Sequence, residues 1–248
     1  MNRQLHAELL KQRTTRTTAG MAAAMVGVVV MAIALHGFGL SVNKLNGRSD
    51  QIGVFIDVGE NLGSLFAALL GAMAITAEVR HGTIRPTLLA TPQRGRVIAA
   101  KAITMLLNGV VLGALATTSA AGAGSLFLGL RGVTVRLDVG DYTLLIVGGA
   151  AAAALWAVIG LGVGAIVRSQ VPTVVGIFVW VLFVENILTG SIPSVGKFAP
   201  AALGRAIAGA RATNGTLHTP ALGAVLLALY AGAAIAAGWA TTTQRDFA

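Results

Sequence analysis

The chain has 248 residues, of which 55% are apolar and only 11% are charged, and its mean hydropathy is +0.79. A soluble domain carries roughly 25% charged residues, so the composition excludes an ordinary soluble protein and indicates an integral membrane protein. The net charge of +9 lies in short loops between apolar runs, which is typical of cytoplasmic loops rather than of a nucleic-acid-binding surface. The chain has no cysteine, which excludes disulfides and cysteine-based metal or redox chemistry.

The first 18 residues differ in kind from the apolar run that follows them. On a helix these residues would form one broad apolar face, made of Leu5, Ala7, Leu9 and Leu10. The other faces would be charged and carry Arg3, Glu8, Lys11 and Arg13. This pattern predicts an amphipathic helix over 1–18 that lies in the cytoplasmic interface, with its cations toward anionic headgroups. A disordered basic leader is the alternative.

Six apolar segments follow, each approaching or exceeding the 20 or so residues that a transmembrane helix needs. They cover 19–40, 53–77, 98–128, 142–167, 171–190 and 220–240. The first is longer than the apolar part of a signal peptide, so we expect it to be retained. The third is long enough for a tilt, a break at Gly122 and Gly124, or a short extracellular extension. We therefore expect 19–248 to form one all-α transmembrane domain with six spans.

The distribution of cations predicts the orientation. An even number of spans places both termini on one side of the membrane. Together with the 78–101 loop and the 168–170 turn, the terminal segments hold 11 of the 18 Lys and Arg residues. Because cytoplasmic loops are enriched in these residues, both termini are expected in the cytoplasm.

The segment 78–101, with the sequence EVRHGTIRPTLLATPQRGRVIAAK, is a basic polar insert between two apolar runs. Such an insert cannot remain in hydrocarbon and must emerge from the membrane. Gly82 permits a sharp change of chain direction, and Thr83 can cap a short helix with Pro86 in its first turn. Pro92 would end that helix.

The same short helix would carry two apolar side chains, Leu88 and Leu89, as contacts for a partner. After it, Arg94, Arg96 and Lys101 are expected to hold the start of the third span at the headgroups. An ordinary basic loop held at the lipid surface is the alternative interpretation.

Ionisable residues close to the outer ends of two spans are further candidates, because charge within a span is costly and often functional. Asp57, Glu60 and Asn61 share one helical face at the start of the second span, and Glu185 lies late in the fifth. These residues are able to line an outer vestibule or bind a cation. For the first three, a solvated helix end is the favoured interpretation.

The segment 191–219 is too long for a simple turn and too polar to span the membrane. It contains Pro193, Pro200 and helix-compatible runs, so composition indicates an extracellular loop with helical content. Its cations Lys197 and Arg205 are each able to pair with Glu185.

Signals for nucleotide binding, metal binding or hydrolysis are not found. The sequence GSIPSVGKF at 190–198 has the wrong glycine spacing for a P-loop, and Phe198 stands where Ser or Thr would bind magnesium. No HExxH or GxSxG pattern occurs. Small residues four apart, at Gly59/Gly63, Gly109/Gly113 and Gly160/Gly164, permit close helix packing. In a chain with 32 glycines such pairs are expected by chance.

Two stretches give the chain a family resemblance. They are AELLKQRTTR near the N-terminus and the 78–101 segment, and their place in a six-span topology resembles the permease subunit of ABC-2 type transporters. The family-like skeleton of the second stretch consists of Glu78, Arg80, His81, Gly82, Thr83, Leu88, Leu89, Pro92, Arg94 and Lys101. The resemblance in topology covers the whole chain, whereas the resemblance in specific residues covers only about thirty of them.

The resemblance implies that 78–101 contains a coupling helix, which would dock into a groove on a separate ATP-binding subunit. The implied coupling residues are Glu78, Arg80, His81, Gly82, Thr83, Arg85, Pro86, Leu88, Leu89, Pro92 and Arg94. It also implies that 191–219 is a re-entrant pair of short helices that caps an outer gate. The chain itself would hold no cofactor, would not be an enzyme, and would rely on ATP and Mg²⁺ bound by its partner.

The implied complex contains two ATP-binding subunits and a second permease, either another copy of this chain or a homologue, in the plasma membrane of a bacterium. It would contact lipid but no nucleic acid, and would export an amphiphilic or hydrophobic substrate such as a drug, antibiotic or lipid. Apolar side chains proposed to line the substrate pathway between opposed second and fifth spans are Leu65, Phe66, Met73, Phe178 and Trp180. Core packing explains these side chains equally well.

Two other classes remain as alternatives. An ATP-independent secondary transporter or channel would need polar or ionisable residues near the midplane and often inverted repeats, and the sequence shows neither. A membrane anchor or signalling scaffold without transport activity is the second alternative. The resemblance of 78–101 to a coupling segment argues against it.

Overall fold

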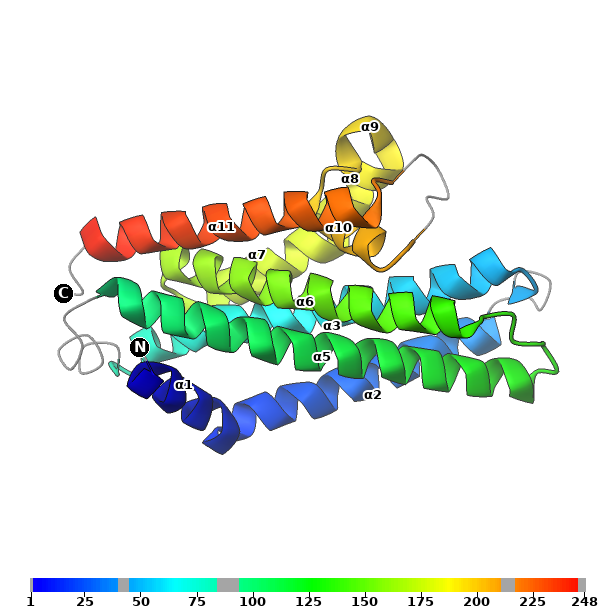
Figure 1. Cartoon of the computed structure of the whole chain (residues 1–248), viewed down its shortest axis with the longest axis horizontal. Helices are drawn as coiled ribbons and strands as arrows, with labels where there is room; N and C mark the ends of the chain where they lie inside the picture. Colours follow the sequence, from blue (N-terminus) through cyan, green and yellow to red (C-terminus); the bar gives the residue numbers. More distant parts are fainter. Residues whose placement is uncertain (1, 40–44, 84–93, 211–216, 245–248) are drawn as a thin grey trace.

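The computed structural model describes residues 2–39, 45–83, 94–210 and 217–244, and within them it is helical with no strand (Figure 1). Its elements are α1 (Asn2–Thr14), α2 (Arg16–Gly39), α3 (Arg48–Arg80), α5 (Arg94–Leu130), α6 (Val139–Val167), α7 (Gln170–Val179), the π-helical turn η2 (Trp180–Val184), α8 (Glu185–Ser191), α9 (Pro193–Gly196), α10 (Pro200–Ile207) and α11 (Pro220–Gln244).

Six helices are long and apolar enough to cross a membrane, as the sequence predicts. They are α2, α3, α5, α6, α11 and the continuous rod formed by α7, η2 and α8. The chain is thus a multi-pass, all-α membrane protein. The third span is one unbroken helix from Arg94 to Leu130, so the suggested break at Gly122 and Gly124 is not present.

Three of the spans form the centre of the bundle. In the most apolar stretch of each span, α3, α5 and α6 are 61%, 50% and 67% buried within the protein, whereas α2, the α7–α8 rod and α11 are only 17% to 22% buried. Because the outer three expose apolar side chains such as Leu35 and Leu229, those faces suit contact with lipid or with another membrane protein. The central trio therefore carries the rigid core.

Close backbone contact joins the central helices, and small residues make it feasible. A Cβ added at Gly160 of α6 would lie only 1.9 Å from the carbonyl oxygen of Ala68 in α3. Gly63 and Gly113 are similarly tight, the former against Ala116 and the latter against the backbone of Gly149. The glycine pairs that the sequence alone could not separate from chance therefore lie at helix interfaces.

The two ends of the bundle differ in what they contain. Helix α1 and the C-terminal end of α11 lie at the same end, whereas α8 and α9 project from the side of the bundle nearer the other end, and α10 packs beside the start of α11 (Figure 1). Two short helices are thus found within 191–219, in agreement with the helical content that composition indicates. The assignment of the terminal end to the cytoplasm, and of α1 to the membrane interface, stays a prediction.

Candidate functional site

A buried ion-pair cluster ties together three segments at the terminal end of the bundle. The ammonium group of Lys101, near the start of α5, donates to Glu78 Oε1 at 2.6 Å and to Glu8 Oε2 at 3.0 Å. It also donates to the carbonyl oxygen of Ala74 at 3.2 Å. Lys101 is only 2% exposed, so α1, the end of α3 and the start of α5 meet at one cation.

A second lysine completes this cluster. Lys11 of α1 donates to Glu8 Oε1 and Glu78 Oε1, both at 2.9 Å. Two cations thus face two carboxylates, which we call the anchor cluster: Glu8, Lys11, Glu78 and Lys101. Burial tends to raise the pKa of Glu8, but the nearby ammonium groups of Lys101 and Lys11 outweigh it and hold that pKa below its ordinary value.

The same balance applies to Lys11. Burial tends to lower its pKa, but hydrogen bonds to Glu8 and Glu78 outweigh this effect and raise the pKa above its ordinary value. Both α1 residues are therefore charged at neutral pH. This cluster, with its four hydrogen-bonded ion pairs, holds α1 against the end of α3 and the start of α5.

Two expectations about this end are wrong. The sequence interpretation placed Lys101 at the headgroups, but the packing of α1 against α5 encloses its side chain within the protein. It also placed Glu8 on an outward charged face and Leu10 on the apolar face. Instead Glu8 is buried against Lys101, and Leu10 is 56% exposed. The ionic contact, rather than an apolar stripe, sets which face of α1 meets the bundle.

The structure describes the first residues of the expected coupling segment. Helix α3 ends at Arg80, and the backbone N–H of His81 bonds to the carbonyl of Ala77. Gly82 then adopts φ +70°, the left-handed conformation that favours glycine. Thr83 donates its backbone N–H to the carbonyl of Glu78 at 3.0 Å. The chain thus turns sharply at Gly82, as its sequence predicts.

The other residues implied in coupling lie less close to the anchor cluster. Arg80 donates to the side-chain oxygen of Gln170 at 3.2 Å and so links the end of the second span to the start of the fifth. Arg94 begins α5. The remaining ones fall outside the described residues, and with them the expected helix: Arg85, Pro86, Leu88, Leu89 and Pro92.

The outer acidic residues of α3 differ in burial, because Glu60 is enclosed in the protein whereas Asp57 is half exposed. Glu60 of α3 is 1% exposed, accepts from the Ser64 hydroxyl at 2.8 Å, and lies directly against α10 at Gly204, where an added Cβ would stand 2.4 Å from Oε1. Among the described residues no donor reaches its Oε2. Asp57, one turn earlier, is half exposed, and Asn61 is partly buried.

The fifth span contributes the second buried carboxylate. Glu185 is 2% exposed and accepts from the indole N–H of Trp180 at 2.6 Å and from the backbone N–H of Ala201 at 2.5 Å. The sequence left open an ion pair with Arg205 or Lys197. Instead Arg205 pairs with Asp57 at 3.0 Å.

The five proposed pathway residues do not share one surface in this chain. Leu65 is buried in the core, and Phe66 packs against core residues. Phe178 and Trp180 are 36% and 43% exposed, and Met73 is partly buried. Within a single chain, core packing accounts for Leu65, whereas the α7 and η2 residues remain available to a second copy or to lipid.

The anchor cluster was missed by sequence reasoning, although a signal for it exists. Segments 1–18 and 78–101 are both strongly basic, and each contains a single acid, Glu8 in the first and Glu78 in the second. A lone carboxylate among cations at the end of a span points to a specific partner. Finding which lysine binds it required the three-dimensional packing of α1 against α5.

Among the described residues, no group of three or more His, Asp or Glu side chains is able to hold a metal ion. Comparisons with models of known protein families and with curated proteins find no match to the chain. Function is therefore argued from the geometry together with the resemblance in the sequence.

Proposed function

We propose that the chain is the membrane subunit of an ATP-driven ABC-2 type exporter. It would move an amphiphilic or hydrophobic substrate out of a bacterial cell, powered by two copies of a separate ATP-binding subunit with ATP and Mg²⁺. A second permease, identical or homologous, would complete the pathway. Export of this substrate class fits a chain whose outer three spans expose apolar side chains.

The anchor cluster is the observation that carries this proposal. A loop that receives force from a partner must be fixed firmly at both of its ends, or the force would only deform the loop. In the sequence, Glu78 precedes residues 84–93 and Lys101 follows them, and the two side chains bond at 2.6 Å. The anchor cluster thus joins the end of α3 to the start of α5, on either side of the expected coupling residues, and joins both to α1.

The connection gives a physical route for transmission. A force on the coupling residues between α3 and α5 would move both helices together, because Lys101 of α5 is bonded to Glu78 of α3. The close glycine contacts between α3 and α6 would then carry the movement into the core, since close-packed interiors transmit strain. Arg80, bonded to Gln170, extends the same movement to the start of the fifth span.

Copurification tests the proposal. A tagged chain isolated from its native membrane is expected to bring down an ATP-binding subunit with ATPase activity. Replacing Leu88 and Leu89 with Glu should abolish this association, because charged side chains cannot enter an apolar groove without great cost. The matched control replaces Ile192 and Val195 with Glu; both are exposed on the opposite side of the expected membrane and should leave association intact. Failure to recover any ATPase with the native chain would contradict the proposal.

A second candidate function is an ATP-independent transporter, and one observation favours it. Glu60 and Glu185 are ionisable, almost fully buried and located within span helices, as ion-coupled carriers require. Reconstitution separates the two candidates. Transport by the purified chain alone, driven by an ion gradient and lost in Glu60→Gln, would support the carrier, whereas an absolute requirement for the ATPase subunit supports the exporter.

A further inference from the structure

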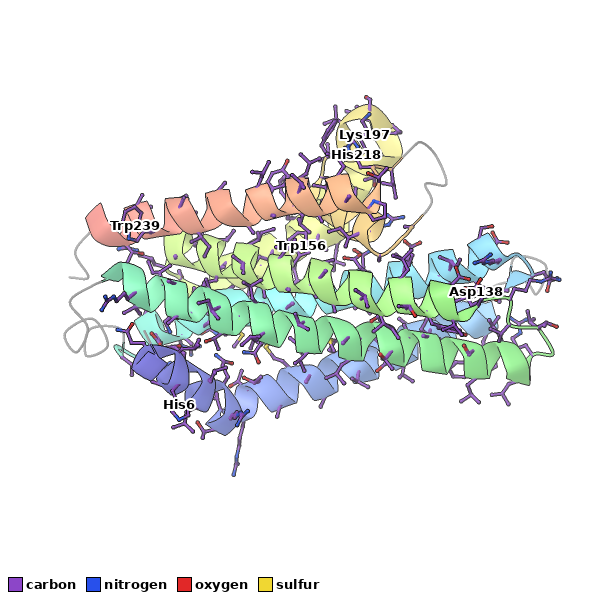
Figure 2. The ribbon with its side chains drawn as sticks, in the orientation of Figure 1. His6, Asp138, Trp156, Lys197, His218 and Trp239 are labelled. Atoms are coloured by element: carbon purple, nitrogen blue, oxygen red, sulfur yellow. The ribbon has the colours of Figure 1, made fainter. Side chains whose placement is uncertain are left out.

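Helix α10 fills the region between the outer halves of several spans. Leu203 and Ile207, on one of its faces, are almost fully buried and belong to the same buried cluster as Leu65 of α3, Trp156 of α6 and Leu227 of α11. In Figure 2, Trp156 lies within the bundle beneath the α8–α10 region. Helix α10 is therefore an apolar element packed among these spans.

The N-terminal end of α10 is held by the fifth span. The N-cap residue Ala199 has no side-chain acceptor, so the first N–H groups of α10 need an external partner. Glu185 supplies it by accepting from Ala201 N–H, and a carboxylate is also favourable at the positive end of the helix dipole. We call this contact, with the Trp180 bond to the same carboxylate, the buried clasp.

A local irregularity in the fifth span makes the buried clasp feasible. Trp180 and Glu185 are five residues apart, and side chains at that spacing diverge on an α-helix. The π-helical turn Trp180–Val184 widens the helix so that the indole N–H of Trp180 reaches Glu185. Such turns are rare and frequently occur at functional sites.

The C-terminal end of α10 is held by the second span. Arg205 pairs with Asp57 of α3 at 3.0 Å, and the two side chains are 24% and 51% exposed. An ion pair with this exposure is weakened by water and salt. We call this contact the exposed clasp. It lies toward the opposite end of α10 from the buried clasp, so α10 bridges the second and fifth spans.

We propose that α10 is an outer strap fastened by two clasps of unequal strength, and that it opens first at the exposed clasp while the buried clasp serves as the hinge. The asymmetry follows from burial: Glu185 is sequestered with two short hydrogen bonds, whereas Asp57 stands half in water. The inference goes beyond the proposed function, since it holds whether ATP or an ion gradient drives the chain.

Thiol labelling tests the strap directly, because the chain has no native cysteine. Ala202→Cys reports on the N-terminal half of α10 and Ala206→Cys on its C-terminal half; both positions are 1% to 2% exposed. With the purified full chain in lipid nanodiscs and a water-soluble maleimide, Asp57→Asn is expected to raise the labelling rate of Ala206→Cys by about threefold to fivefold. Ala202→Cys should stay protected. Glu185→Ala, in contrast, should raise the labelling of Ala202→Cys by about tenfold or more.

Two further variants keep the result interpretable. The exchange Asp57→Arg with Arg205→Asp should restore protection of Ala206→Cys, which a folding defect would not do. Ser194→Cys, exposed on α9, should label at one constant rate in every background and reports the intact outer surface. Equal labelling of Ala206→Cys with and without Asp57→Asn would overturn the exposed clasp. Equal acceleration of Ala202→Cys and Ala206→Cys by Asp57→Asn would overturn the hinge.

Discussion

At the residue scale, the most informative side chain is Lys101. A lysine buried in a membrane protein is costly unless charged partners and hydrogen bonds compensate for its lost hydration. Lys101 has two carboxylates and one carbonyl oxygen within hydrogen-bond distance. The sequence suggests that Lys101 contacts lipid headgroups, but in the structure it joins three helices inside the protein.

We predict that Lys101→Met destabilises the chain by about 3 kcal/mol, because breaking a buried ionic network leaves the carboxylates of Glu8 and Glu78 without their main cation. Lys11→Met removes a cation from the same network, but Lys11 is 45% exposed, so it should cost no more than about 1 kcal/mol. Denaturant unfolding in detergent micelles measures both. Combining Lys101→Met with Glu8→Gln and Glu78→Gln should recover part of the loss, and equal costs for the two single lysine variants would contradict this account.

At the element scale, the positions of helices could be predicted from sequence more fully than their contacts. Hydropathy identifies all six spans, because the hydrocarbon core demands about 20 apolar residues in each. It does not reveal which helices are central, since apolar residues on every face satisfy lipid and protein equally. The anchor cluster and the two clasps depend on residues far apart in the chain, such as Glu8 with Lys101 and Asp57 with Arg205.

Local chemistry explains where single predictions succeeded or failed. The turn at Gly82 was predictable because a left-handed conformation favours glycine. Which face of α1 packs against the bundle was not predictable, because the buried charge of Glu8 is explained only by Lys101 on another helix. The π-helical turn at Trp180–Val184 likewise has no local sequence signal such as proline or glycine. Glu185, which directly follows the turn, bonds both to Trp180 and to Ala201 of α10, and the first of these bonds depends on the widened turn.

Contact between α3 and α6 gives a prediction at this scale. Gly160→Ala places a methyl group 1.9 Å from the Ala68 carbonyl oxygen, so the two helices must separate, at a cost of about 1–3 kcal/mol. Gly27→Ala in α2 is the matched control: a Cβ there meets nothing within 4 Å, and alanine is the better helix former. Thermal unfolding of the purified chain should show a lower midpoint for the first and an equal or higher midpoint for the second. A neutral Gly160→Ala would mean that this interface is loosely packed.

At the scale of the whole molecule, α3 connects the two candidate regions. Asp57 belongs to the exposed clasp and Glu78 to the anchor cluster, and both lie on the same unbroken helix Arg48–Arg80. Their separation of 21 residues corresponds to about 32 Å along the helix axis, close to the roughly 30 Å of a hydrocarbon core. If α3 crosses a bilayer, this spacing would place one cluster at each of its surfaces. A rigid rod between them favours coordinated movement at both surfaces.

This arrangement predicts a definite topology, which the cysteine-free chain makes simple to measure. In intact cells, a membrane-impermeant maleimide should label Thr134→Cys and Ser194→Cys, both exposed at the side expected to face outward. Thr14→Cys and Ser169→Cys, exposed at the opposite side, should react only after the cells are opened. The expectation follows from the excess of cations in the terminal segments and the 78–101 loop, which favours their retention in the cytoplasm. Labelling of Thr14→Cys in intact cells would reverse the orientation, place the anchor cluster away from any cytoplasmic ATPase, and so remove the basis of the exporter proposal.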